Sequence, residues 1–215
     1  VRVGAEADGL LVEFAKITKR VIDGLNRVKV ISRYGVGVDN VDVRAATRRG
    51  IYVANTPYDL ENVADHSVML ILALARKLPR ALWMTRQGRW EWNSLRPLPG
   101  LAELSVGIVG LGNVGRKVAL RLRAFGCNLL GYDPYVSRSA FKKIGIKRVG
   151  LQTLLRRSDL ISLHVPLTPE TRHLIGERQL RLMKPTAYLV NVSRGSVVDE
   201  RALYRALKGK VIAGA

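Results

Sequence analysis

The sequence is poor in features that would place the protein outside the cell or in a membrane. It has one cysteine, Cys127, so no internal disulfide can form, and a reducing cytoplasm is the expected compartment. The longest apolar run, residues 68–75, is far shorter than the roughly 20 residues that cross a bilayer. The first residues carry neither the basic nor the apolar region of a secretory signal. We therefore expect no membrane association.

Acidic residues are also scarce, since 17 Asp and Glu face 36 Lys and Arg, which gives a net charge of +19. This charge raises the possibility of a nucleic-acid partner. The basic residues, however, are scattered in pairs such as Arg48-Arg49 and Lys142-Lys143 and form no continuous stripe. The pattern favours a solvated basic surface, with a polyanion partner and the loss of acidic flanking sequence as minor alternatives.

The chain alternates short β-branched runs with helical patterns, which is typical of α/β layers around a parallel sheet. In the first 57 residues we expect strands at 10–14, 28–32 and 51–54 and a helix at 41–49. A helical pattern over 60–87 contains Pro79, which predicts two helices that meet there. Beyond it we expect strands at 105–109, 128–132, 160–165, 187–192 and 211–213, and helices at 113–125, near 139, at 177–182 and at 199–207. This series predicts a doubly wound sheet.

A glycine pattern of the G-x-G-x-x-G type follows the strand expected at 105–109 and opens the next helix. In that place the first glycine allows a tight turn, the second lets a pyrophosphate approach the backbone, and the third allows close packing of helix on sheet. The positive end of the helix dipole then faces the phosphates. The residues predicted to bind a dinucleotide here are Gly110, Gly112, Asn113, Val114 and Gly115.

Asp133 ends the next expected strand, eighteen residues after Gly115. A carboxylate at this place accepts hydrogen bonds from the adenosine ribose hydroxyls and would repel a 2′-phosphate, which favours NAD over NADP. The alternative is that Asp133 only forms the turn before Pro134.

Two arginines stand at expected strand ends, where ligands bind in this architecture. Reduction of a 2-keto acid needs a cation for the carboxylate and the carbonyl, and the planar guanidinium of Arg194 suits both. Arg33 precedes Gly35 and Gly37, whose backbone N–H groups could form an anion-binding concavity. A surface arginine and an ordinary glycine turn are the alternatives.

The three histidines are too dispersed in the sequence to ligate a metal, and we expect no metal site. We interpret His164 as a residue of a cofactor loop, His66 as packed within a helix and His173 as exposed. These assignments leave the proton donor of a reduction unaccounted for.

Several ordered blocks resemble the D-isomer-specific 2-hydroxyacid dehydrogenase family, nearest to its bacterial members similar to C-terminal binding protein and phosphoglycerate dehydrogenase. The resemblance covers essentially the whole chain. The resemblance rests on residues 33–40, 50–57, 63–66, 110–115, 158–171, 183–195 and 198–199.

The resemblance implies a partial, flavodoxin-like substrate-binding domain over residues 1–57 and an NAD-binding Rossmann domain over 58–215. Arg194 matches the catalytic arginine of the family, and the substrate-carboxylate loop matches Arg33, Gly35, Val36 and Gly37. The residues that match the cofactor-lining positions are His164, Val165, Pro166, Thr171, Val192 and Ser193. A small 2-keto or 2-hydroxy acid is the implied substrate, and a homodimer through the helix at 63–77 and Trp83, Trp90 and Trp92 is the implied assembly, although core packing explains these tryptophans equally well.

The implied activity is NAD-dependent interconversion of a D-2-hydroxy acid and a 2-keto acid. An NAD(H)-sensing, corepressor-like regulator is the alternative, and a truncated pseudo-enzyme that acts through dimerisation is a third. The acid/base histidine of the family and its glutamate partner match positions beyond Ala215, and the first strands of the substrate domain match positions before Val1. On this comparison we expect the 215 residues alone to bind NAD weakly and not to turn over.

Overall fold

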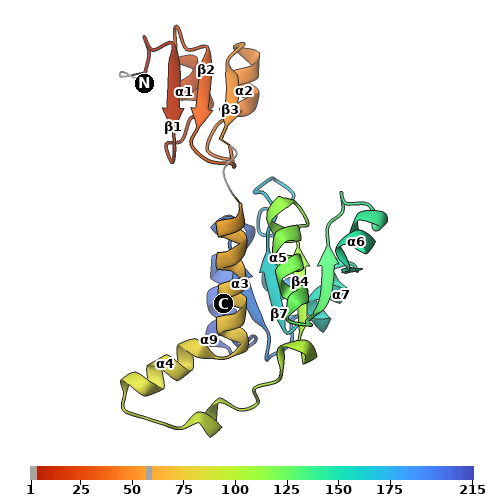
Figure 1. Ribbon diagram of the computed structural model, residues 1–215. Coiled ribbons are helices and arrows are strands. Elements are labelled where there is room, and N and C mark those ends of the chain that lie inside the picture. The colour runs from red at the N-terminus through yellow and green to blue at the C-terminus, as the bar shows by residue number, and fades with distance from the viewer. Residues whose placement is uncertain (1–3, 57–59) are drawn as a thin grey trace. The chain divides into compact units, whose positions relative to one another are not determined.

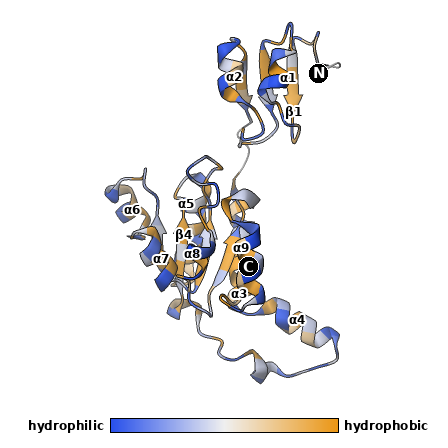
Figure 2. Ribbon diagram, turned by 180° about the vertical axis from the view of Figure 1, so that it is seen from behind, coloured by the Kyte–Doolittle hydropathy of each residue, from blue (hydrophilic) through white to orange (hydrophobic). Residues whose placement is uncertain are grey.

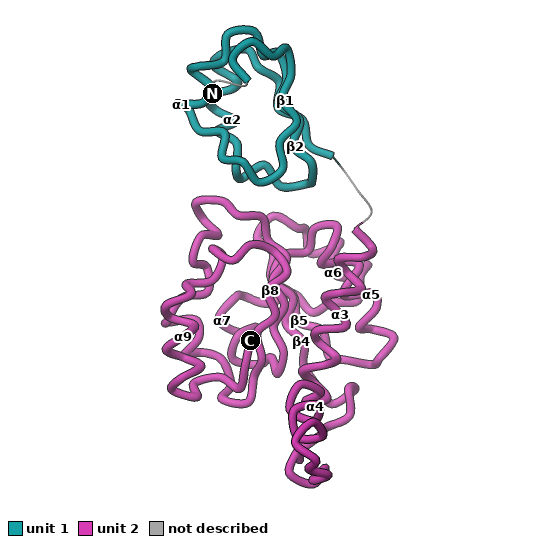
Figure 3. Tube along the Cα trace, turned by 90° about the vertical axis from the view of Figure 1, so that its left-hand side faces the viewer, with its two compact units in different colours: residues 1–59 teal, residues 60–215 magenta. Residues whose placement is uncertain are grey.

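A computed structural model of the protein describes residues 4–56 and 60–215. The chain divides into two compact units, Val1–Asp59 and Leu60–Ala215 (Figure 3). The boundary expected between residues 57 and 58 lies outside the described residues. Each unit has its own sheet and its own apolar core.

The first unit is a small α/β layer pair. Its strands β1 (Gly9–Val12), β2 (Val30–Arg33) and β3 (Tyr52–Asn55) are parallel and lie in the order β1-β2-β3. Helices α1 (Lys19–Asp23) and α2 (Val43–Arg48) contribute Ile22, Ala45 and Ala46 to one core with the sheet. The expected strands and helix are confirmed with small shifts. Helix α1 was not expected, because its five residues bury a single apolar side chain and give no periodic signal.

The second unit contains five parallel strands in the order β6-β5-β4-β7-β8. From β4 (Ser105–Val109) the chain adds β5 (Asn128–Tyr132) and β6 (Lys147–Arg148) on one side. It then crosses to the other side of β4 and adds β7 (Leu160–Leu163) and β8 (Tyr188–Asn191). This order confirms the doubly wound sheet, with its switch point at β4. Strand β6 was not expected, because its two exposed basic residues have no strand pattern.

Helices cover both faces of this sheet (Figure 1). One face packs on α3 (Glu61–Ala75), α5 (Asn113–Ala124) and α6 (Arg138–Ile144), and the other on α7 (Leu151–Arg157), α8 (Glu177–Leu180) and α9 (Glu200–Lys208). Along β4, Val106 and Ile108 face the first layer and Val109 faces the second, as the period of two requires. Helices such as α4 (Leu78–Arg86) and α9 alternate hydrophobic and hydrophilic residues (Figure 2).

The long helical pattern divides as expected. Helix α3 ends at Ala75, Lys77 adopts a left-handed conformation with φ of +52°, and α4 begins with Pro79 in its first turn. The Trp- and Pro-rich segment that follows contains the short 3-10 helices η1 (Trp92–Leu95) and η2 (Leu101–Glu103).

Two expectations were wrong. The strand expected at 211–213 is absent from the described chain, where this segment makes a single parallel bridge between Tyr188 and Gly214 after a left-handed Lys210. His66 was expected to be packed, but it is exposed on α3, because its side chain lies off the face that carries Ala64, Val68 and Ile71. In the described parts of the chain, no helix combines the length and the apolar character needed to cross a membrane.

Candidate functional site

Four strands of the second unit end in register at the carboxyl edge of the sheet. Val109 of β4 pairs with Tyr132 of β5 and with Leu163 of β7, and Leu163 pairs with Asn191 of β8. The residues that follow these strand ends therefore lie in one row: Gly110, Asp133, His164 and Val192. Because β4 is the switch point, this edge is the place where the fold binds ligands. The register thus brings four predicted cofactor residues to one edge.

The three glycines of the loop after β4 differ in what a side chain would meet at each of them. Gly110 has φ of +91°, and a Cβ on it would lie 2.9 Å from the backbone of His164. A Cβ on Gly115 would lie 2.1 Å from the carbonyl oxygen of Gly110. A Cβ on Gly112 would meet nothing within 4 Å. The first and third glycines therefore form the turn, whereas the second faces open space.

Asp133 is bound to the glycine loop. Its Oδ2 accepts a hydrogen bond of 2.8 Å from the backbone N–H of Leu111, and its Oδ1 accepts one of 2.9 Å from that of Tyr135. Each carboxylate oxygen can accept a second hydrogen bond, so the side chain still has acceptor capacity for ribose hydroxyls. The contact with Leu111, which couples Asp133 to the phosphate loop, was not predicted from the sequence.

His164 directly follows β7 and is half-buried as a residue, but both of its ring nitrogens are buried. Neither ring nitrogen has a hydrogen-bond partner among the residues that the structure describes. Burial lowers the pKa of His164 to about 4, so the ring is neutral at neutral pH. A neutral imidazole at the carboxyl edge of the sheet can orient a ligand through a hydrogen bond. It is not the protonated imidazolium that would donate a proton in a reduction.

The loop after His164 is folded by Thr171. The Thr171 hydroxyl donates to the carbonyl of Pro166 at 2.6 Å and accepts from the backbone N–H of Thr168 at 2.8 Å. Val165 is half-buried and Pro166 is exposed, so both are accessible to a ligand at the edge. Thr171 acts here by holding the loop closed, a role that the sequence did not reveal.

Arg194 lies in a turn directly after β8, held by Asn191. The Asn191 amide donates to the carbonyl of Arg194 at 2.9 Å, and its Oδ1 accepts from both the N–H and the hydroxyl of Ser193, at 3.0 and 2.7 Å. The Arg194 guanidinium is half-buried and donates to the Ser193 carbonyl at 3.0 Å. Asn191 is thus a positioning residue that the sequence analysis missed, and a strand-ending asparagine before a turn was the available signal.

In the first unit, Arg33 folds back over its own loop. Its guanidinium donates to the Tyr34 carbonyl at 2.7 Å and fills the space that a Cβ on Gly35 would occupy, 1.4 Å from Nη1. Gly35 has φ of +130°, and the Asn55 amide donates to the Val36 carbonyl at 2.8 Å. The loop that carries Arg33, Gly35, Val36 and Gly37 is thereby attached to the end of β3.

The other two histidines are exposed, His66 on α3 and His173 in a turn with φ of +52°. We assign the acid/base to none of the three histidines. Within residues 4–56 and 60–215, no group of three or more His, Cys, Asp or Glu side chains could hold a metal ion.

The carboxyl edge of the second unit fits a dinucleotide. The open space at Gly112 gives a pyrophosphate direct access to the backbone, and no side chain caps the amino end of α5. Asp133 follows the end of the neighbouring strand β5, where this fold places the carboxylate that binds the ribose.

Comparison with known proteins agrees with this geometry. Residues 68–215 match the family model described as D-isomer specific 2-hydroxyacid dehydrogenase, NAD binding domain. The chain is 44% identical over 214 residues to D-3-phosphoglycerate dehydrogenase of Methanocaldococcus jannaschii, covering 98% of this chain and 41% of that protein. It is 46% identical over 203 residues to glyoxylate reductase of Korarchaeum cryptofilum, covering 93% and 61%.

The fold is similar to that of D-lactate dehydrogenase from Aquifex aeolicus complexed with NAD and lactic acid. The TM-score is 0.94 at 36% identity, over 99% of this chain and 64% of that one. The chain therefore spans less than two thirds of the length of each of these relatives. Their names favour an enzyme over an NAD-sensing regulator, and the matched domain confirms NAD as the expected cofactor. The chain belongs to the D-isomer specific 2-hydroxyacid dehydrogenase family.

Proposed function

We propose that the protein is an NAD-dependent oxidoreductase that interconverts a D-2-hydroxy acid and a 2-keto acid. The observation that carries the proposal is the row of strand ends at the carboxyl edge of the second unit, with Arg194 two residues beyond Val192. An arginine at that edge binds a carboxylate next to the site of a nicotinamide cofactor. The names of the relatives, each of which acts on a small 2-hydroxy or 2-keto acid, support the same chemistry.

In this proposal the residues of the chain bind and orient, and bound NAD(H) would supply the hydride. The proton that completes the hydroxyl group would come from an acid/base that we assign to none of the three histidines. The loop from Gly110 to Gly115 holds the pyrophosphate, and Asp133 accepts hydrogen bonds from the adenosine ribose. The lining of the nicotinamide end consists of His164, Val165, Pro166, Thr171, Val192 and Ser193. Arg194 binds the substrate carboxylate and polarises the carbonyl, which stabilises the negative charge that develops on its oxygen. In the first unit, we assign the binding of a substrate carboxylate to Arg33 and the loop of Gly35, Val36 and Gly37, within a flavodoxin-like substrate-binding domain.

The activity is tested on the chain extended to the length of its relatives, because the 215 residues alone are expected not to turn over. NADH and a panel of 2-keto acids are added, and the loss of NADH absorbance is followed. The panel contains glyoxylate, pyruvate and hydroxypyruvate, and we expect turnover of at least one of them. Arg194→Gln should lower kcat/KM by about a thousandfold, in the range known for loss of one oxyanion-stabilising group. Arg181→Gln, an exposed arginine on the far end of the same unit, is the matched control. Lack of turnover with saturating NADH and the whole panel would contradict the proposal.

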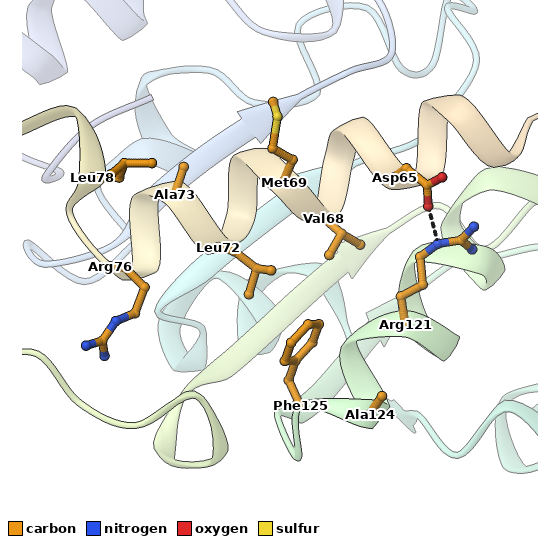
Figure 4. Close-up of a pocket in the computed structure, with 10 residues that line it drawn as sticks. All are labelled: Asp65, Val68, Met69, Leu72, Ala73, Arg76, Leu78, Arg121, Ala124 and Phe125. Carbon is orange, nitrogen blue, oxygen red and sulfur yellow. Dashed lines mark hydrogen bonds and ion pairs between the residues drawn. The ribbon is translucent and has the colours of Figure 1, made fainter. Parts of the chain in front are cut away.

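We further propose that two copies associate through a groove on α3. The groove has a volume of about 760 Å³ and is lined by apolar side chains of α3 and α5, with Arg76, Asp65 and Arg121 at its rim (Figure 4). Leu78 at the start of α4 also lines it, and α4 continues with Leu82 and Trp83, which are 50% and 57% exposed. A two-fold dimer brings the same patch of both copies together, and this patch combines an apolar groove with exposed apolar side chains of α4, so we propose a second copy as its occupant.

The dimer is tested by light scattering after size exclusion. Met69→Glu, at a half-exposed position in the groove, should shift the protein from dimer to monomer, whereas Tyr204→Glu on α9 should not. A wild-type protein that is monomeric at micromolar concentration would overturn the dimer.

We also place the protein in the cytoplasm. The basis is its single cysteine, because disulfide-stabilised proteins belong to oxidising compartments.

A further inference from the structure

Leu111, inside the glycine loop, is held at three points. Its side chain is fully buried in the core that the sheet shares with α3, α5 and α6. Its backbone N–H donates to Oδ2 of Asp133 at 2.8 Å, and its carbonyl accepts a hydrogen bond of 2.7 Å from Nε of Arg116. Both polar groups of its backbone are therefore bound by side chains, one from the end of β5 and one from α5.

The bond from Arg116 fixes more than one carbonyl. A peptide group is planar and trans, so the C=O of Leu111 and the N–H of Gly112 point in opposite directions. A guanidinium that holds the Leu111 carbonyl therefore turns the Gly112 N–H away from itself. Asp133 acts in the same way on the preceding peptide group, through the Leu111 N–H. The two side chains together fix two consecutive peptide planes, in the segment that leads into the amino end of α5.

Arg116 contributes a hydrogen-bond donor here rather than a charge. It is the fourth residue of α5, close to the positive end of the helix dipole, where a cation is disfavoured. The residue as a whole is exposed, so water and salt screen its charge. Its bond to Leu111, in contrast, is partly buried. The position and the contact of Arg116 therefore favour a role in shaping the loop.

We propose that Arg116 is a positioning residue of the cofactor site, which holds the glycine loop so that its N–H groups face the pyrophosphate. The inference rests on the proposed dinucleotide site and adds to it a residue outside the G-x-G-x-x-G pattern. Gly112 has no side chain to restrict its backbone, so the peptide group between Leu111 and Gly112 can flip once the bond is lost. The Leu111 carbonyl would then turn toward the anion and repel it. Arg116 thus acts through the loop and not by contact with the cofactor.

The test compares two substitutions of Arg116 in the chain extended to the length of its relatives. Glutamine places an amide N–H as many bonds from Cα as Nε of arginine, but it has no charge, whereas methionine has neither donor nor charge. Calorimetric titration with ADP, which carries the two linked phosphates, measures binding. Arg116→Met should weaken ADP binding about tenfold, as the loss of one hydrogen bond does. Arg116→Gln should stay within about threefold of wild type, because only a screened charge is lost.

Arg123→Met is the matched control. It removes an arginine from the same helix together with a hydrogen bond of 3.0 Å from Nη1 to the Ile144 carbonyl, but this contact lies near the carboxyl end of α5. ADP binding should be unchanged in this variant. Urea unfolding of each variant shows that it is folded and separates an effect on binding from an effect on stability.

Equal weakening by Arg116→Gln and Arg116→Met would show that the charge of Arg116 acts on the phosphates, and the positioning role would be overturned while the dinucleotide site stands. Unchanged binding in both variants would overturn it too, as would equal weakening by Arg123→Met. If the wild-type protein binds no ADP, the dinucleotide site fails and the role of Arg116 fails with it.

Discussion

The two units each carry a glycine-containing loop directly after a parallel strand, but they use these glycines differently. In the second unit, the missing side chain of Gly115 leaves room for the backbone oxygen of Gly110, and Gly110 itself packs against the backbone of His164. In the first unit, the missing side chain of Gly35 leaves room for the guanidinium of Arg33. The first arrangement is built from rigid backbone and the second around a movable, charged side chain. A loop that cradles phosphate needs exposed N–H groups, whereas a loop that presents an arginine needs space for it.

The arginine-bearing turns of the two units are, in contrast, alike. Arg33 donates to the carbonyl of Tyr34, and Arg194 to that of Ser193. Each turn is also tied by an asparagine that ends a strand, Asn55 for the first and Asn191 for the second. The two turns differ in where the asparagine stands, since Asn55 reaches the Val36 carbonyl from the neighbouring strand β3, whereas Asn191 ends the strand before its own turn and binds the carbonyl of Arg194.

The largest effect should come from breaking the backbone packing of the glycine loop. Gly115→Ala places a Cβ 2.1 Å from the Gly110 carbonyl, which cannot move without shifting the turn. We expect a loss of about 3 kcal/mol in the free energy of unfolding, the upper range for overpacking, and loss of NAD binding. Urea unfolding and calorimetric titration with NADH measure the two effects.

Gly112→Ala is the matched control, because its Cβ meets nothing within 4 Å and its φ of −69° suits alanine. Its stability should stay within about 1 kcal/mol of wild type while NADH binding weakens, because the methyl group lies where the pyrophosphate approaches. Equal destabilisation by both substitutions would contradict the separate roles assigned to these glycines.

An intermediate loss of stability is expected in the first unit, where a substitution displaces a side chain rather than the backbone. Gly35→Ala forces a φ of +130° on alanine and displaces Arg33, at a cost of about 1–3 kcal/mol. In an Arg33→Ala background the same substitution should cost less, because only the backbone strain remains. A double-mutant cycle by urea unfolding measures this coupling, which we expect to exceed about 0.5 kcal/mol. A coupling of zero would show that Gly35 serves the backbone alone.

The sequence predicts these regions unequally well. Strands β4 and β5 have the bounds expected from the sequence, because they are buried apolar runs that end at glycine or aspartate. Helix α7 (Leu151–Arg157) was not predicted from the sequence, because its seven residues are too few to show a helical period. Strand β6 is held only by its pairing with β5, and nothing in a Lys-Arg pair predicts a strand. Segment 211–213 has the β-branched composition of a strand, but local composition does not determine pairing.

At the candidate site, the sequence predicts the positions of the ligand-facing residues but not the contacts that hold them. The spacing of Gly110, Gly112 and Gly115 identifies the loop, because the turn, the approach of a pyrophosphate and the packing of the helix each depend on the local backbone. The bond from Leu111 to Asp133 joins residues 22 apart and follows from strand register. The bond from Arg116 to the Leu111 carbonyl likewise depends on how the loop turns, which the sequence did not reveal.

The smallest effects should come from the two asparagines that tie the arginine turns. Asn191 makes three hydrogen bonds within its turn and Asn55 donates one to Val36, and both side chains are exposed. Asn191→Ala should therefore cost about 1 kcal/mol of stability and Asn55→Ala less, because solvent replaces part of each exposed bond. Since Asn191 acts through Arg194, its loss should raise KM for the keto acid more than it lowers kcat. Asn191→Asp keeps the acceptor for Ser193 but loses the donor to Arg194, so a KM like that of Asn191→Ala would assign the effect to Arg194. If Asn191→Asp instead restores the wild-type KM, the contact with Ser193 is the one that positions the turn.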